Sequence, residues 1–456
     1  MTAGRYERRS VNLTEGNIIK NIILFALPLL AGQLFQNLYN SVDSIVVGRA
    51  VGVTALAAVT SCSDISQVII GFFTGLSVGA GVAFSRYFGA GNRERLHESI
   101  HTSLTFAMIM GVVMLTIGEL LSPLLLRVVS CPADVYPEAM VYLRIYLIGI
   151  IFTSMYNVQA GVLRSVGDSR SPFIFLVCAS LTNIVLDILF VVVLHMGVAG
   201  VAIATILSQS ESFFLVTRKM LRTDDVYRLV PQDLKVDVPL LLEILQLGIP
   251  AAIQSCLVTF SNLFVQRYIN SFGTYAMAGA GAGKKIDNYI SQITVSLGQS
   301  CTTYVGQCVG AEKYERAFKG IRYVIYINLV VYVCLAVPLY FLAPQAASLF
   351  TNNPDAISYA VTMMHTLLPL YFLQSFHQVL SNSVRGFGRS TVTMITTITS
   401  LIFIRQLYLA IAMHISHDIR LVFISWPVGW TCSTLLAFTY YYFAIKRPYL
   451  NQQKQT

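Results

Sequence analysis

Long apolar segments separated by short polar ones make up most of this chain of 456 residues. A run of about 20 apolar residues is long enough to cross a bilayer as a helix. The pattern predicts twelve such helices, with ends uncertain by about four residues. They lie near 18–47, 53–85, 98–122, 139–163, 172–195, 198–218, 240–268, 275–308, 318–342, 357–384, 391–414 and 419–444.

The composition supports an all-α integral membrane protein. Hydrophobic residues make up 55% of the chain and charged residues only 12%, whereas a soluble domain carries about 25% charged residues. The eight cysteines are scattered, mostly within apolar runs. We therefore expect neither a disulfide framework nor a metal site from them.

The net charge of +9 is explained by topology rather than by nucleic acid. Most basic residues lie in the N-terminal segment, the C-terminal segment and the even-numbered loops. Because cytoplasmic loops are enriched in Lys and Arg, both termini are predicted to be cytoplasmic. We expect a multi-pass protein of the cell membrane that contacts lipid, binds no nucleic acid and is a monomer.

An internal repeat with an offset of 221 residues divides the chain. Its carriers include Gly52 and Gly273, Gly89-Ala90 and Gly310-Ala311, and Gly167 and Gly388. Six spans per repeat preserve orientation, so the pattern predicts two parallel six-helix lobes. The lobes are predicted at 1–217 and 239–456, joined by a cytoplasmic linker at 218–238.

Asp43 and Asp187 lie within the first and fifth predicted spans, in the first lobe. Asp43 has Tyr39 one helical turn before it, and Asp187 has Asn183 at the same spacing. A charge in the bilayer costs at least about 2.5 kcal/mol, so intramembrane acids usually face a protein interior and serve function. The alternative is a structural hydrogen bond. Helix-rise arithmetic places both acids and Thr205 at similar depth, which allows one shared cavity for a proton or a cation.

The second lobe has no equivalent acid pair, since Asp187 corresponds to Tyr408. It carries basic residues within its spans instead. Lys284, Lys285 and Asp287 are interpreted as mutually neutralising, and Arg405 is expected to find a partner inside the protein. Asp64, in the second span, is interpreted either as lining the outer mouth of a cavity or as a solvated charge at its rim.

One motif points to different chemistry. His97-Glu98-Ser99-Ile100-His101 fits the H-E-x-x-H pattern, in which two histidines one turn apart bind zinc and the glutamate acts as a base. An intramembrane metalloprotease would need a further ligand, and Asp355 is predicted on the opposite side of the membrane. We therefore expect neither an enzyme nor a metal site here.

Several motifs resemble those of the multidrug and toxic compound extrusion (MATE) family of secondary transporters. The resemblance covers nearly the whole chain and is carried by Pro28, Tyr39-Asn40-Ser41-Val42-Asp43, Val47-Gly48-Arg49, Ala55-Leu56-Ala57-Ala58, Gly89-Ala90-Gly91-Asn92, Arg164-Ser165-Val166-Gly167-Asp168-Ser169, Asn183–Asp187 and Gly197–Thr205.

The resemblance implies export of amphipathic, often cationic compounds in exchange for protons or sodium ions. It implies a polar network of Tyr39, Asp43, Asn157, Asn183, Asp187 and Thr205, and bending of the first helix near Pro28. Other members of the family use carboxylates in the seventh and tenth spans. Here the middle of those spans offers no acid, and Gln374 and His377 are possible cavity lining.

The sequence thus predicts an ion-coupled antiporter that exports organic cations and drugs. Protons are favoured, because two acids with Tyr39 and Asn183 beside them suit a shared proton. Sodium stays open, and no cofactor is expected. The main alternative is a lipid-linked oligosaccharide flippase of the wider superfamily, which would need a strongly basic cavity.

Overall fold

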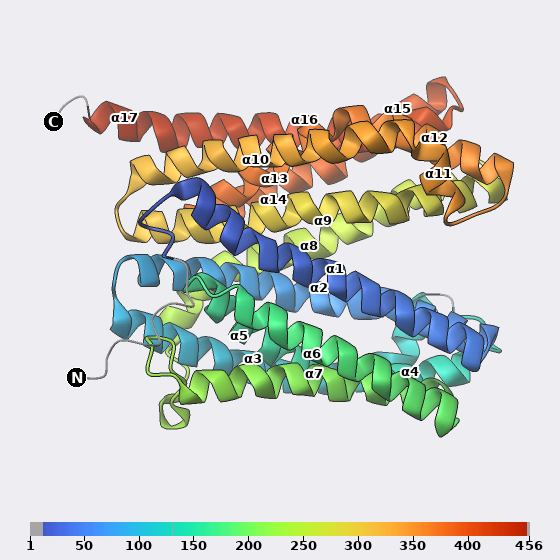
Figure 1. The fold of residues 1–456 in the computed structure, drawn as a ribbon, viewed down its shortest axis with the longest axis horizontal. Coiled ribbons are helices and arrows are strands. Elements are labelled where there is room, and N and C mark those ends of the chain that lie inside the picture. Colours follow the sequence, from blue (N-terminus) through green and yellow to red (C-terminus); the bar gives the residue numbers. More distant parts are fainter. Residues whose placement is uncertain (1–11, 130, 454–456) are drawn as a thin grey trace. The chain divides into compact units, whose positions relative to one another are not determined.

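The computed structural model describes residues 12–129 and 131–453. Within these ranges the side chains of Asn40, Ser44, Arg49, Val53 and Asp64 are not described, so the interpretation of Asp64 lies outside the described part. The described chain is helical, joined by short turns and one longer linker (Figure 1).

The first half of the chain has seven α-helices and one π-helical turn. These are α1 (Ile18–Ala50), α2 (Val53–Gly89), α3 (Arg93–Val128), α4 (Tyr136–Ile148), α5 (Ile150–Ser165), α6 (Arg170–Asp187), η1 (Ile188–Val193) and α7 (Gly197–Arg222). α4 and α5 meet at an angle of 45°, so one predicted span is a bent pair.

The second half follows the same order with more interruptions. Its elements are η2 (Pro231–Asp233), α8 (Val238–Asn270), α9 (Thr274–Gly310), α10 (Tyr314–Phe341), α11 (Ala343–Ser348), α12 (Pro354–Leu367), η3 (Leu368–Leu370), α13 (Tyr371–Gly386), α14 (Ser390–Ile398), η4 (Thr399–Ile404), α15 (Arg405–Ile415), α16 (Ile419–Tyr440), η5 (Tyr441–Lys446) and α17 (Arg447–Gln453).

Every predicted span coincides with a helix or a run of consecutive helical elements. Ten such segments in the described residues are long and apolar enough to cross a membrane, and the bent pair α4–α5 raises the number to eleven. The remaining predicted span is α9. Its 37 residues are sufficient in length, but Lys284, Lys285 and Asp287 make it more polar than the others.

Glycines with positive φ explain part of the internal repeat. Gly52 (φ 127°) and Gly273 (φ 93°) precede α2 and α9, and Gly167 (φ 90°) and Gly388 (φ 77°) lie in the turns after α5 and α13. Side chains with a Cβ rarely adopt this conformation. The same backbone is therefore required at equivalent turns of both repeats.

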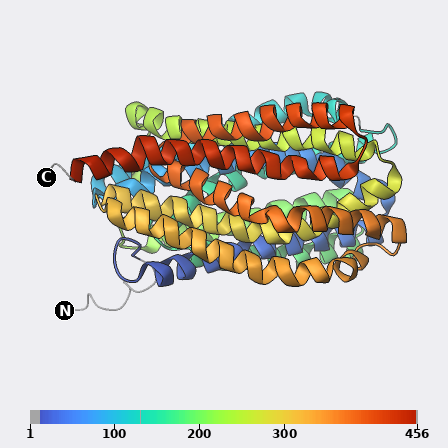
Figure 2. The same cartoon turned by 90° about the horizontal axis from the view of Figure 1, so that it is seen from above.

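By packing, the chain divides into two compact units. The first contains Leu27–Ala252 and the second contains Leu13–Ala26 with Ile253–Thr456. The helices of each unit run lengthwise beside one another (Figure 2). The division falls inside α8 and places the start of α1 with the second unit. The lobe boundaries at 217 and 239 stay a prediction.

Close backbone contact holds α8 to α2 within the first unit. A Cβ added at Gly79 would lie 2.2 Å from the Cα of Gly248, and one added at Gly75 would lie 2.4 Å from the Cα of Ala252. Only glycine allows helices to approach this closely. The small residues of α2 are therefore packing residues.

Candidate functional site

Asp187 is the last residue of α6, where the helix passes into the π-helical turn η1. Its side chain is completely buried, and neither carboxyl oxygen accepts a hydrogen bond from a donor among the described residues. Short π-helical segments occur often at functional sites. A buried polar group without a partner is costly and calls for a functional explanation.

Asp43 comes from α1 and faces Asp187. The carboxyl groups lie close enough to interact, and the buried Oδ1 of Asp43 also has no hydrogen-bond partner among the described residues. Asn183, one turn before Asp187, is buried with both amide atoms likewise unpaired. The structure thus brings together the two acids that the sequence placed at similar depth.

Tyrosines surround this pair, and sequence reasoning included only one of them. Tyr39 lies near Asp43, Tyr146 and Tyr156. Tyr142 lies near Asp43 and Tyr39, and its ring stacks on Tyr146 at a centroid distance of 5.9 Å. Tyr142 and Tyr146 are one turn apart on α4. The spacing could have indicated that the two rings lie on one face of the helix, but it does not show which other helix that face contacts.

Asn157 and Thr205 are bound within their own helices. The Thr205 hydroxyl donates to Val201 O (3.0 Å), and the Asn157 amide donates to Thr153 O (2.8 Å). Pro28 lies inside α1, which is one helix from Ile18 to Ala50. The roles that the family resemblance gives these residues stay predictions.

Arg405 does find interior partners, as expected, but they are neutral. It is 1% exposed, and its guanidinium donates to Asn262 Oδ1 (3.0 Å) and Ser261 Oγ (2.6 Å) on α8. Gln406 donates to Ser261 as well. Arg405 therefore fastens α15 to α8, a structural task that accounts for two of its donor groups.

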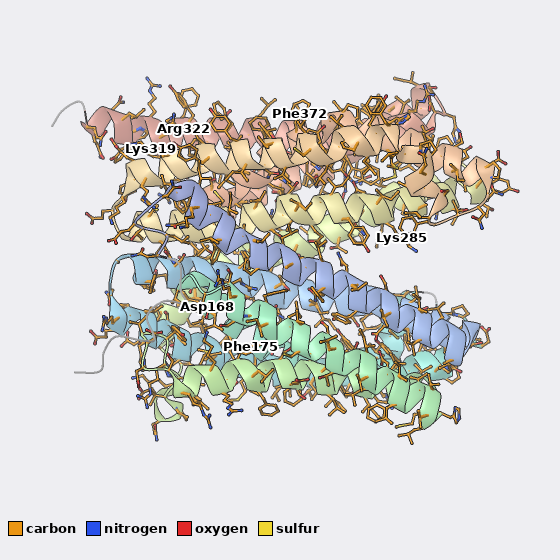
Figure 3. The ribbon with its side chains drawn as sticks, in the orientation of Figure 1. Asp168, Phe175, Lys285, Lys319, Arg322 and Phe372 are labelled. Atoms are coloured by element: carbon orange, nitrogen blue, oxygen red, sulfur yellow. The ribbon has the colours of Figure 1, made fainter. Side chains whose placement is uncertain are left out.

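The other polar residues of the second unit divide into two kinds. Gln374 and His377 are buried, and they bond to Ser291 Oγ (3.2 Å) and Ser381 Oγ (3.3 Å). Lys284 and Lys285 are exposed. Lys285, which is labelled on α9 in Figure 3, holds its ammonium 5.5 Å from the centre of the Phe350 ring.

A buried ion pair organises one end of the first unit. Asp168, in the turn before α6 (Figure 3), pairs with Lys219 of α7. Asp168 also accepts hydrogen bonds from the backbone N–H (3.0 Å) and the hydroxyl (2.7 Å) of Ser171. The motif around Asp168 that contributed to the family resemblance is therefore a structural junction.

These features define a polytopic membrane protein with a buried acidic site, the general form of a secondary transporter. The chain matches the MatE family model twice, over residues 28–189 and 250–409. It belongs to the MatE family, which comprises transporters rather than enzymes. The double match confirms the predicted all-α fold and its internal repeat.

Individual relatives agree over nearly the full length. The chain is 30% identical over 447 residues to the Probable multidrug resistance protein YoeA of Bacillus subtilis, covering 95% of this chain and 96% of that protein. It is 28% identical over 403 residues to the Probable multidrug resistance protein YpnP of the same organism, covering 88% and 90%. A solved MATE structure in the bent conformation is 25% identical, with a TM-score of 0.91 and coverage of 98% and 99%.

Proposed function

We propose that this transporter exports amphipathic, mostly cationic organic compounds in exchange for protons, and that Asp43 and Asp187 form the coupling site. The observation that carries the proposal is the buried Asp187, whose carboxyl oxygens accept no hydrogen bond from a described donor and lie against the carboxyl group of Asp43. The names of YoeA and YpnP, both probable multidrug resistance proteins, support the class of cargo.

A shared proton is the simplest occupant of this pair. Two carboxylates in a low-dielectric interior repel each other, and one proton between them relieves that repulsion. A carboxyl group becomes a hydrogen-bond donor once it is protonated, and Asn183 offers an acceptor one turn away. Loss of the proton creates negative charge beside Tyr39, Tyr142 and Tyr146, which favours an organic cation.

Exchange follows from this competition. A cation and a proton both neutralise the same pair of acids, so binding of one favours release of the other. Aromatic rings contribute attraction for an organic cation of about 0.5–2 kcal/mol each. We further propose a monomer in the cell membrane, surrounded by lipid, with both termini in the cytoplasm.

Sodium is the second candidate for the coupling ion, because carboxylate and amide oxygens also bind hard cations. Transport into proteoliposomes under separately imposed pH and sodium gradients separates the two. A pH gradient alone should drive uptake of an organic cation, and a sodium gradient alone should not. Uptake that follows only the sodium gradient would contradict the proton assignment.

Matched variants test the site in the same assay. Asp187→Asn and Asp43→Asn should each reduce gradient-driven uptake to the level of empty liposomes. Asp225→Asn, which removes a carboxylate from the linker, should transport like the unmodified protein. The flippase alternative requires a basic cavity. Arg405, which has the lowest exposed fraction of the described Lys and Arg residues of the second unit, is engaged with Ser261 and Asn262.

A further inference from the structure

A cluster of metal-ligating side chains lies where the linker crosses the start of α3, within the first unit. His97 and His101 are one turn apart on α3, with ring centroids 4.0 Å apart. Asp233, the last residue of η2 in the linker, approaches His97, with Oδ2 2.8 Å from Nε2. The ligand atoms of all three lie within 4.8 Å of one another.

The hydrogen bonds of His101 fix the neutral tautomer of its imidazole ring that can bind a metal through Nε2. Its Nδ1 lies 2.7 Å from His97 O, and since a carbonyl only accepts, Nδ1 carries the proton. Nε2 is then the free base, and it accepts from the Val230 N–H at 3.0 Å. A histidine ligand whose second nitrogen donates to a carbonyl is the usual arrangement around protein-bound metals.

We infer that His97, His101 and Asp233 form a binding site for a divalent transition-metal ion of the Zn²⁺ or Co²⁺ type. The sequence alone predicted no metal site at the two histidines, because the third ligand, Asp233, comes from the distant linker. Two imidazoles and one carboxylate are a ligand set that these ions accept. Tetrahedral ligands around zinc lie about 3.3 Å apart. The separation of 2.8 Å between His97 Nε2 and Asp233 Oδ2 would therefore widen slightly on binding.

Binding changes how the linker is held. The metal takes the Nε2 lone pair of His101 that now accepts from Val230, and it replaces the direct His97–Asp233 hydrogen bond. The ion and the Val230 amide thus compete for one nitrogen. The linker thus loses its hydrogen bonds from Val230 to His101 and between Asp233 and His97, and it is held instead by the bond between Asp233 and the metal.

The surroundings leave room for the ion and for water. A cavity of about 500 Å³ adjoins the three residues. Besides the three ligands, its charged lining residues are three acids and three bases: Glu94, Glu98, Asp225, Arg93, Arg228 and Lys235. Exposed fractions of 33% for the His97 side chain and 50% for that of Asp233 allow access from solvent. Glu98, the residue after His97, is paired with Arg95 at 3.5 Å.

Cobalt titration of the tag-free protein in detergent tests the site, with Zn²⁺ as competitor. The unmodified protein should show saturable visible absorption typical of nitrogen and oxygen ligands at low coordination number, and Zn²⁺ should abolish it. Because His101 is buried and its removal endangers folding, the partly exposed ligands carry the test. His97→Ala and Asp233→Asn should each weaken binding by more than about 100-fold.

Asp225→Asn is the matched control, since Asp225 lines the same cavity without belonging to the three ligands. Its affinity for Co²⁺ should equal that of the unmodified protein. Absence of saturable binding, or equal affinities in His97→Ala, Asp233→Asn and Asp225→Asn, would overturn the inference. These absorption measurements are independent of transport, so they do not depend on the proposed coupling.

Discussion

Glu312 has the same left-handed backbone conformation as Gly91, its counterpart 221 residues earlier. The φ angles are 59° for Glu312 and 68° for Gly91. Both residues lie in the turn between a 37-residue helix and the next helix of their repeat. The same turn is present in both repeats, although only the first repeat has glycine, the residue best suited to this conformation.

Glu312→Gly should therefore stabilise the protein. A residue other than glycine in this conformation costs of order 1 kcal/mol or more, so we expect a gain of about 1 kcal/mol. Gly91→Ala makes the opposite change at the equivalent position of the first repeat. A Cβ at Gly91 would meet no atom within 4 Å, so its expected loss of about 1 kcal/mol comes from the backbone alone. Thermal unfolding in detergent measures both, and equal stability of both variants and the unmodified protein would contradict the explanation.

The junction around Asp168 should be a major source of stability in the first unit. Its side chain is 3% exposed and that of Lys219 is 22% exposed. Asp168→Ala removes the carboxylate partner of Lys219 and the acceptor of two Ser171 donors, and it leaves the lysine bound only to the Ser171 hydroxyl. We expect a loss of about 3 kcal/mol. Lys219→Ala should cost a similar amount, and the double variant less than the sum. Fully additive losses in thermal unfolding would show that the two side chains are not coupled.

Gly79 should not tolerate a larger residue. In Gly79→Ala the new methyl would clash with the backbone of α8 at Gly248. Because backbone yields less than a side chain, we expect a loss of about 3 kcal/mol. Gly81 is the matched control on the same helix, since a Cβ there meets nothing within 4 Å. Gly81→Ala should leave stability unchanged or raise it by about 0.5 kcal/mol. The same effect at both positions would argue against close packing.

Local sequence patterns were sufficient to predict the helices and the internal repeat. Apolar runs identified every span, and Gly52 and Gly273 identified equivalent turns, because both signals depend on neighbours along the chain. The meeting of Asp43 with Asp187 was also accessible, since depth along a helix follows from its rise. None of this required knowledge of packing.

Contacts between elements far apart in the sequence could not be predicted from local patterns. The tyrosines at positions 142 and 146 approach the acids only because α4 bends against α5 and packs beside the site. Asp233 reaches His97 because the linker folds back onto α3, and no local period encodes that path. For the same reason Arg405, expected to face the interior, was not assigned to its neutral partners Ser261 and Asn262.

The most direct test of the proposed coupling is proton release on binding of an organic cation, measured with a pH indicator in weakly buffered detergent solution. The unmodified protein, protonated at the acid pair, should release protons as the cation saturates the site. Asp187→Asn should release none, and Asp225→Asn should behave like the unmodified protein. Cation binding without proton release in the unmodified protein, or undiminished release in Asp187→Asn, would contradict a mechanism in which proton and cargo compete for Asp43 and Asp187.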